Sequence, residues 1–219
     1  MYLSASSIRL LSSSILLLFP AYAQFLIESL SFGHQDKLSG NGRTIPGWQI
    51  SGEGHTPPLL SDRVILTPPA PGRLRGALWT EASINYPEWQ LDFEFRASGP
   101  ERGGGNLQVW FTKEHLPDSG LASVYTVGPF DGLVLVLDQY GGTGGMIRGF
   151  LNDGSVQFKT HHNLDGLAFG HCDYAYRNLG RPSRFRVKQG HDGLEVIVDD
   201  KTCFKSSQVS HEVELQSRS

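Results

Sequence analysis

Two aspartates at predicted strand ends are the first residues whose type and position could do chemistry. Asp138 closes the apolar run LVLVLD and is followed by QYGGTGG, while Asp165 lies in the segment HHNLDGLAFG. A hard cation such as calcium prefers several oxygen ligands, from carboxylates, backbone carbonyls, amide side chains and water. Asp138, the backbone carbonyl of Tyr140 and Asp165 could supply such oxygens from two loops. The alternative is that both aspartates only form turns, which their short polar side chains favour.

A second pair of carboxylates raises the question of hydrolytic chemistry. Asp92 and Glu94 lie two residues apart in WQLDFEFRAS, so they share one face of a predicted strand, as the paired acids of a glycoside hydrolase could. Arg96 occupies the next position on that face, which favours solvated residues on a half-buried strand. His161 and His162 are adjacent and would point to opposite faces of a strand, so they are poorly placed to hold one zinc ion. We therefore predict no catalytic residues.

The elements that position these residues are predicted to be strands. WQLDFEFRAS alternates between apolar and polar residues, NLQVWFTKE follows as another strand, and LVLVLD is apolar on both faces and therefore central. NDGS, between MIRGFL and VQFKTHH, and GHDG, between SRFRVKQ and LEVIVDD, predict two hairpins. Helix is expected only as single turns near 115–122 and 173–179. With 26 glycines and 12 prolines, this pattern predicts an all-β sandwich of two antiparallel sheets in one domain.

The N-terminus predicts a compartment. Residues 1–23 contain Arg9, the apolar run ILLLF and then AYA, which together indicate a secretory signal peptide; a short membrane anchor is the alternative. No later stretch is apolar enough to cross a bilayer. A net charge of −3 gives no indication of a nucleic-acid partner. Because an even number of cysteines in an oxidising lumen favours pairing, Cys172 and Cys203 are expected to form one disulfide rather than two free buried thiols.

The order of the segments carries a resemblance to a known family. SFGH, IPGWQISG, RVILTP, GALWT, WQLDFEFRASG, GGGNLQVWFT, DGLVLVLDQY, GFLNDGS, HHNLDGLAFGHCDYAYRN and LEVIVDDKTCF follow one another over residues 28–205. In this order they resemble the L-type (legume-type) lectin domain of the ER–Golgi cargo receptors, in particular its fungal subgroup. The resemblance implies a concanavalin-like (jelly-roll) sandwich that binds sugar in loops above its curved front sheet.

The resemblance also implies roles for individual residues. By position, Asp138 matches the family's metal-binding aspartate, Tyr140 its backbone-carbonyl ligand and Asp165 its second metal-binding acid. His162 matches the histidine that contacts sugar. The implied partners are high-mannose glycoproteins, and the implied location is the lumen of the secretory pathway, comprising the ER, the ER–Golgi intermediate compartment and the Golgi. Full-length relatives are single-pass type I membrane proteins.

Three departures from the family pattern modify these expectations. Gly142 stands where calcium-dependent members carry an asparagine, and Gly105 stands where they carry an aspartate that holds sugar hydroxyls. We therefore expect either one cation, calcium or potassium, or no ion at Asp138 and Asp165, with glycan binding weak or lost. After Phe204 the chain does not resemble the family's final strands. We expect a C-terminally truncated domain over residues 24–205, followed by an atypical, disordered tail over 206–219.

Three functions therefore remain open from the sequence. The first is a carbohydrate-binding lectin-like domain of a cargo receptor, without enzyme activity. The second is a protein-interaction module of the same pathway, which forms hetero-oligomers with a related cargo receptor and has lost sugar binding. The third is a secreted glycoside hydrolase that uses Asp92 and Glu94.

Overall fold

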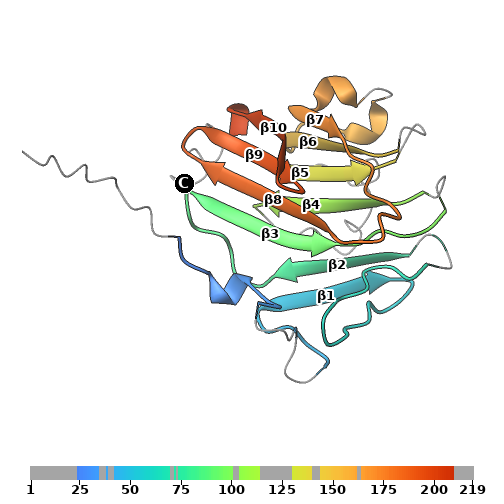
Figure 1. Cartoon of the computed structure of the whole chain (residues 1–219). Coiled ribbons are helices and arrows are strands. Elements are labelled where there is room, and N and C mark those ends of the chain that lie inside the picture. Colours follow the sequence, from blue (N-terminus) through green and yellow to red (C-terminus); the bar gives the residue numbers. More distant parts are fainter. Residues whose placement is uncertain are drawn as a thin grey trace, which may run out of the picture.

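The regular secondary structure of the described part of the chain consists almost entirely of β-strands (Figure 1). The structure is a computed structural model that describes residues 24–34, 38, 42–69, 72, 74–100, 104–113, 130–139, 144–161 and 164–209. The predicted signal peptide and the end of the predicted tail lie outside these residues, as do Tyr140, Gly142 and His162. None of the described helices is long and apolar enough to cross a membrane.

The strands form three antiparallel sheets. Their bounds are β1 (Trp48–Glu53), β2 (Arg75–Thr80), β3 (Trp89–Phe95), β4 (Asn106–Thr112), β5 (Asp131–Asp138), β6 (Met146–Asp153), β7 (Gly170–Asp173), β8 (Ser183–Gly190), β9 (Gly193–Val198) and β10 (Lys201–Ser206). One sheet has the order β4-β5-β6-β7, the second has the order β10-β9-β8-β3, and β1 pairs with β2 alone. Short 3-10 turns are η1 (Glu28–Leu30), η3 (Phe158–Thr160) and η4 (Asp165–Leu167).

The two four-stranded sheets pack face to face around one apolar core, as predicted for a sandwich. Alternate residues of each strand point into it because successive side chains point to opposite faces of a sheet. The fully buried members include Leu135, Leu137 and Ile147 from one sheet and Phe185 and Val196 from the other. Val209 is also buried in this core, so the packed body continues beyond β10.

The outer face of β5 is buried as well, which confirms the prediction that LVLVLD is a central strand. Val134 and Val136 on this face belong to a second cluster with Phe150 of β6. Phe158 and Leu164 cover the cluster. They belong to the segment between β6 and β7, residues 154–169, which we call the covering segment. A β-strand buried on both faces reads as a continuous apolar run, whereas β3, with one wet face, alternates.

One predicted strand is absent from the described part of the chain because its residues cover this cluster instead. VQFKTHH forms no strand in its described residues and therefore makes no hairpin with β6; it contributes η3 instead. The Asn152 side chain turns the chain here, because its Oδ1 accepts hydrogen bonds from the backbone N–H groups of Gly154 and Val156. Phe158 then packs on the outer face of the sheet rather than extending its edge. Asp165 was likewise expected at a strand end and lies instead in η4.

The other turn predictions have mixed outcomes. SRFRVKQ and LEVIVDD form the β8–β9 hairpin, as predicted. Over 173–179 the described chain forms no helical turn, because β7 ends at Asp173 and Arg177 makes an isolated bridge to Ala97. The turn predicted near 115–122 lies outside the described residues.

The disulfide between Cys172 and Cys203 is present, which confirms the expected pairing. Cys172 lies on β7 and Cys203 on β10, the edge strands of the two four-stranded sheets, and their Cα atoms are 5.4 Å apart. Beside it, the Phe169 and Phe204 rings meet edge to face at 5.8 Å. The bond therefore joins the two sheets at one end of the sandwich.

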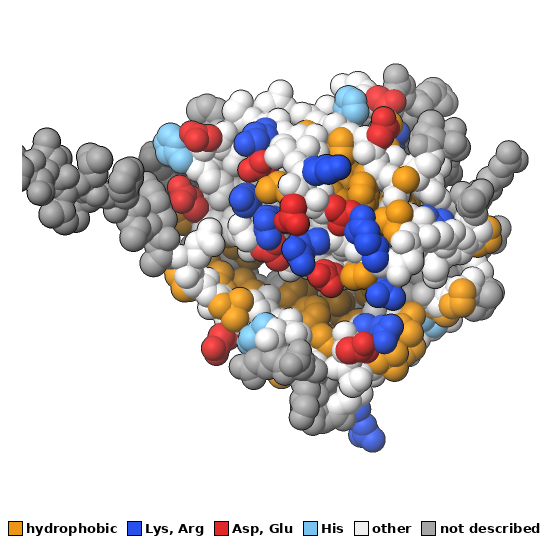
Figure 2. Space-filling model, in the orientation of Figure 1, with side chains coloured by type: hydrophobic (Ala, Val, Ile, Leu, Met, Phe, Trp, Pro, Cys, Tyr) orange, Lys and Arg blue, Asp and Glu red, His pale blue; other side chains and the backbone are white. Residues whose placement is uncertain are grey.

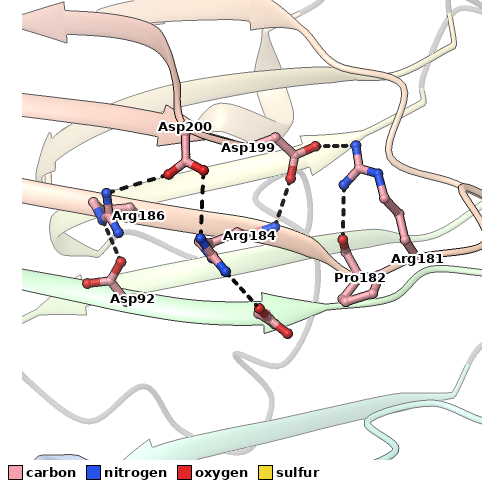
Figure 3. Close-up of polar contacts among 8 residues, drawn as sticks. Asp92, Arg181, Pro182, Arg184, Arg186, Asp199 and Asp200 are labelled. Carbon is pink, nitrogen blue, oxygen red and sulfur yellow. Dashed lines mark hydrogen bonds and ion pairs between the residues drawn. The ribbon is translucent and has the colours of Figure 1, made fainter.

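Charged side chains gather on the outer face of the β3–β8–β9–β10 sheet, above a hollow lined by hydrophobic side chains between β3 and β2 (Figure 2). Figure 3 shows Asp92 paired with Arg186 on this face. Arg184 lies 3.5 Å from Glu94. Asp200 lies 3.6 Å from Arg184 and 3.8 Å from Arg186. The two acids considered for hydrolytic chemistry are thus paired with arginines directly opposite them on β8, as expected of a solvated strand face.

Asp199, in the turn between β9 and β10, predicts an acid-sensitive contribution to stability. Its carboxylate accepts hydrogen bonds from Arg181 (2.7 Å), the Tyr174 hydroxyl (2.8 Å) and the Arg184 backbone N–H (3.0 Å). The Arg181 guanidinium, more than the other donors, lowers the pKa of Asp199 far below its usual value. A depressed folded-state pKa stabilises the fold above the unfolded-state pKa of about 3.9, and this contribution disappears as pH falls through the folded-state pKa.

We expect Asp199→Asn to lower the free energy of unfolding at pH 7 by about 1.5–3 kcal/mol, because hydrogen bonds to a charged group are lost. The difference from wild type should shrink as pH falls below about 4. Asparagine tolerates the positive φ of 47° at this position, so the change mainly removes charge. Urea unfolding at neutral and acid pH measures both effects, with Asp192→Asn in the exposed β8–β9 turn as control. An undiminished difference at low pH would contradict the assignment.

Candidate functional site

The site begins with a buried ion pair where β5 ends. Asp138 is the last residue of β5 and lies opposite Met146, the first residue of β6. Arg148 is two residues further along β6, on the same face, so it is a diagonal neighbour within reach of a long side chain. Its Nη1 atom donates to both Asp138 carboxylate oxygens at 2.9 Å.

The same guanidinium also binds Asp165 from the covering segment. Arg148 Nε donates to Asp165 Oδ1 at 2.7 Å. The exposed fraction of the side chain rises from 1% at Asp138, through 10% at Arg148, to 60% at Asp165. The three residues therefore form a charged column from the interior to solvent, which we call the Asp138–Arg148–Asp165 cluster.

The charges of this cluster can be buried because they are paired with one another. A buried charge is strongly unfavourable unless it is paired and hydrogen-bonded, and here two carboxylates share one guanidinium. Tyr176 of the inter-sheet core lies nearby: burial raises its pKa, and the Asp138 charge raises it further. Asp138 thus sits at the boundary between the core and the outer face of the sheet, with Arg148 as its observed countercharge.

Polar side chains on neighbouring strands extend the site across the same face. Asn106 of β4 is directly opposite Asp138, and Gln108 is opposite Val136. Asn106 Oδ1 accepts a hydrogen bond from Gln108 Nε2 at 3.1 Å. On β7, His171 is opposite Arg148 and Asp173 is opposite Met146. Asn106, His171 and Asp173 are exposed. This row of donors and acceptors suits a ligand rich in hydroxyl groups.

The structure brings together part of the set expected from sequence. Asp138 and Asp165, far apart in the chain, meet through Arg148. Tyr140, His162 and Gly142 lie outside the described residues. Gly105 immediately precedes β4 with a φ of 112°, and a Cβ added there would meet no atom within 4 Å. A carboxylate at this position is therefore absent, and the space beside it is open.

Arg148 was not singled out by the sequence analysis. The signal was present, because it is the only charge in MIRGFL, a segment predicted as a strand and otherwise apolar. Arginine is almost never buried unless it is paired, so a lone arginine in such a strand indicates a buried acid partner. Which acid it meets depends on strand register and on the fold of the covering segment.

Comparisons with known proteins agree with this architecture. A model of the legume-like lectin family matches residues 26–217. Protein EMP47 of Saccharomyces cerevisiae is 29% identical over 178 residues, covering 77% of this chain and 38% of EMP47. Protein ERGIC-53-like of Rattus norvegicus is 28% identical over 164 residues, covering 73% of this chain and 31% of that protein. The chain thus spans about a third of the length of these relatives.

Solved structures show the same fold. The VIP36 exoplasmic/lumenal domain in its Ca²⁺- and mannose-bound form superposes with a TM-score of 0.66 at 21% identity, covering 82% of this chain and 77% of that chain. The shared fold alone would not establish the family, but the family model matches most of the chain. That family consists of lectins rather than enzymes. The chain belongs to the legume-like lectin family.

Proposed function

We propose that this chain is the carbohydrate-recognition domain of an ER–Golgi cargo receptor and that it binds mannose-type glycans in the secretory-pathway lumen. The observation that carries the proposal is the Asp138–Arg148–Asp165 cluster. In a protein of a lectin family, this cluster joins the end of β5 to the covering segment. Mannose and Man3GlcNAc are bound by VIP36, whose domain has this fold. The relatives ERGIC-53-like and EMP47 support the cargo-receptor assignment.

The chemistry of the face supports a sugar ligand. Sugar hydroxyl groups both donate and accept hydrogen bonds, and Asn106, His171, Asp173 and Asp165 offer donors and acceptors close to solvent. A rigid backbone sheet and a buried ion pair hold these groups in place before binding, which reduces the entropy lost on association. His162 lies three residues before Asp165 in the chain, and we propose it as a sugar contact.

Affinity is proposed to be low. Gly105 offers no carboxylate to sugar hydroxyls, and a buried polar group left without a partner costs about 1–3 kcal/mol. Gly142 likewise offers no side chain. A free energy of that size corresponds to roughly 5- to 150-fold in the dissociation constant.

Glycan binding by the full chain tests the proposal. We expect weak binding of high-mannose glycans, measured by isothermal titration calorimetry, and at least about tenfold weaker binding after His162→Ala, a loss of about 1.4 kcal/mol. His191→Ala is the matched control, because His191 is an exposed histidine in the β8–β9 turn of the other sheet. Folded wild-type protein that binds no glycan, or equal loss in both variants, contradicts the proposal.

A second function is favoured by the open position at Gly105. A domain that has lost a sugar ligand could retain its sandwich as a surface for hetero-oligomerisation with a related cargo receptor. Analytical ultracentrifugation of the chain with the lumenal domain of such a receptor distinguishes the two. A stable mixed complex, together with no glycan binding, supports the interaction module, whereas glycan binding without complex formation supports the lectin.

A further inference from the structure

The oxygen atoms proposed as cation ligands are already bound by Arg148. Both Asp138 carboxylate oxygens accept from Nη1, and Asp165 Oδ1 accepts from Nε. Three of the four carboxylate oxygens of the two aspartates are therefore bound to one guanidinium. Among the relatives of this fold, VIP36 was solved with Ca²⁺ and Emp46p with potassium, so the question is whether these residues fit such an ion.

The residues described around Asp138 do not fit one. Ca²⁺ takes about 6–8 oxygen ligands at about 2.3–2.6 Å, and the described residues contain no cluster of three or more His, Cys, Asp or Glu that could hold a metal. The Asp138 side chain is 1% exposed, so little water can complete a coordination shell there. An ion touching both carboxylates would also lie beside the guanidinium, whose positive charge repels it.

We propose that Arg148 takes the place of the metal ion in this lectin, as a permanent internal cation that ties the β5 end to the covering segment. Arginine remains protonated throughout the physiological pH range, and its planar donors bind two carboxylates at once. The guanidinium is held by β6, which pairs on both sides with β5 and β7. The organisation of the site is then independent of the calcium or potassium concentration of the compartment.

This inference concerns the same site as the proposed function but does not require that sugar binds. If Arg148 takes the place of the ion, a fall in the calcium or potassium concentration cannot loosen the site.

Thermal unfolding with chelator, with calcium and with potassium tests the inference without any glycan. Wild type should show the same melting temperature in all three, and calorimetry should detect no calcium binding. Arg148→Met keeps the length of the side chain but removes the guanidinium that binds both carboxylates. It should melt lower than wild type in chelator and regain part of the lost stability with added calcium or potassium, because a cation can then approach the two carboxylates without an opposing charge.

Arg148→Lys is the matched control and the safeguard against misfolding of Arg148→Met, because it retains a positive charge. It should fold and remain insensitive to added ions. Calcium binding by wild type with a rise in melting temperature overturns the inference. So does an Arg148→Met protein that is as stable as wild type in chelator and indifferent to cations. Because glycan binding is measured separately, a protein that binds no sugar leaves this result interpretable.

Discussion

Asp138→Ala will lower the free energy of unfolding by about 3–5 kcal/mol, because it leaves Arg148 buried without its inner partner. The Asp138 and Arg148 side chains are 1% and 10% exposed, and two 2.9 Å hydrogen bonds join them. Breaking a buried pair from one side is far more destabilising than losing an exposed one. Urea or thermal unfolding of the purified full chain measures the loss.

A double-mutant cycle separates loss of the pair from loss of one charge. Replacing both members by apolar residues, as in Asp138→Leu with Arg148→Met, should recover much of the stability lost in either single variant. Asp92→Ala is the matched control: Asp92 also pairs with an arginine on a neighbouring strand but is 40% exposed, and we expect a loss of about 1 kcal/mol or less. Equal losses at Asp138 and Asp92, or additive losses in the cycle, would show that the buried pair has no special energetic role.

This result bears on every functional test that uses Asp138. A binding loss in Asp138→Ala could arise from a disordered strand end rather than from a missing ligand for sugar or metal. Asp138→Asn keeps the shape of the side chain and one acceptor for Arg148. Comparing the two variants separates the contribution of the carboxylate charge from that of local order.

Reduction of the Cys172–Cys203 disulfide will destabilise the fold by about 3–4 kcal/mol in the chain-entropy model, because the bond closes a loop with a sequence separation of 31 residues. The effect should be large because the bond joins the edge strands of two sheets. Both sheets approach closely there: a Cβ added at Gly170 would lie 2.3 Å from the Phe204 ring. Losing the bond frees this end of the sandwich.

Urea unfolding with and without a thiol reductant measures the contribution. The variant with both Cys172→Ala and Cys203→Ala should match the reduced wild type and should not respond to reductant. If reduced and oxidised wild type unfold at the same urea concentration, the expected destabilisation on reduction is wrong. A response of the double variant to reductant would show that reductant acts on something other than this bond.

Local sequence determined much of the fold. The alternation in WQLDFEFRAS predicted a strand with one solvent-exposed face, and β3 has such a face. Asp92 and Glu94 lie on it and pair with arginines. The unbroken apolar run in LVLVLD predicted a strand buried on both sides, which β5 is. Both signals follow from the two-residue period of a strand, which needs no knowledge of distant parts of the chain.

The covering segment shows where local reasoning failed. NDGS marks a turn, and VQFKTHH has residues typical of a strand, so a hairpin was the natural prediction. The outer face of β5 and β6, however, presents Val134, Val136 and Phe150, and this apolar surface needs cover. Phe158 and Leu164 provide it. Burying that surface outweighs local strand propensity, which depends strongly on context.

The sequence by itself determined most of the strand pattern, the paired cysteines and the two aspartates at which chain segments were expected to meet. Only the tertiary structure decided what lies between those aspartates. Strand register places Arg148 diagonally beside Asp138, and the covering segment brings Asp165 to the other side of the same guanidinium. Sequence spacing cannot show this, because the countercharge of a buried acid is chosen by which side chains share a face in three dimensions.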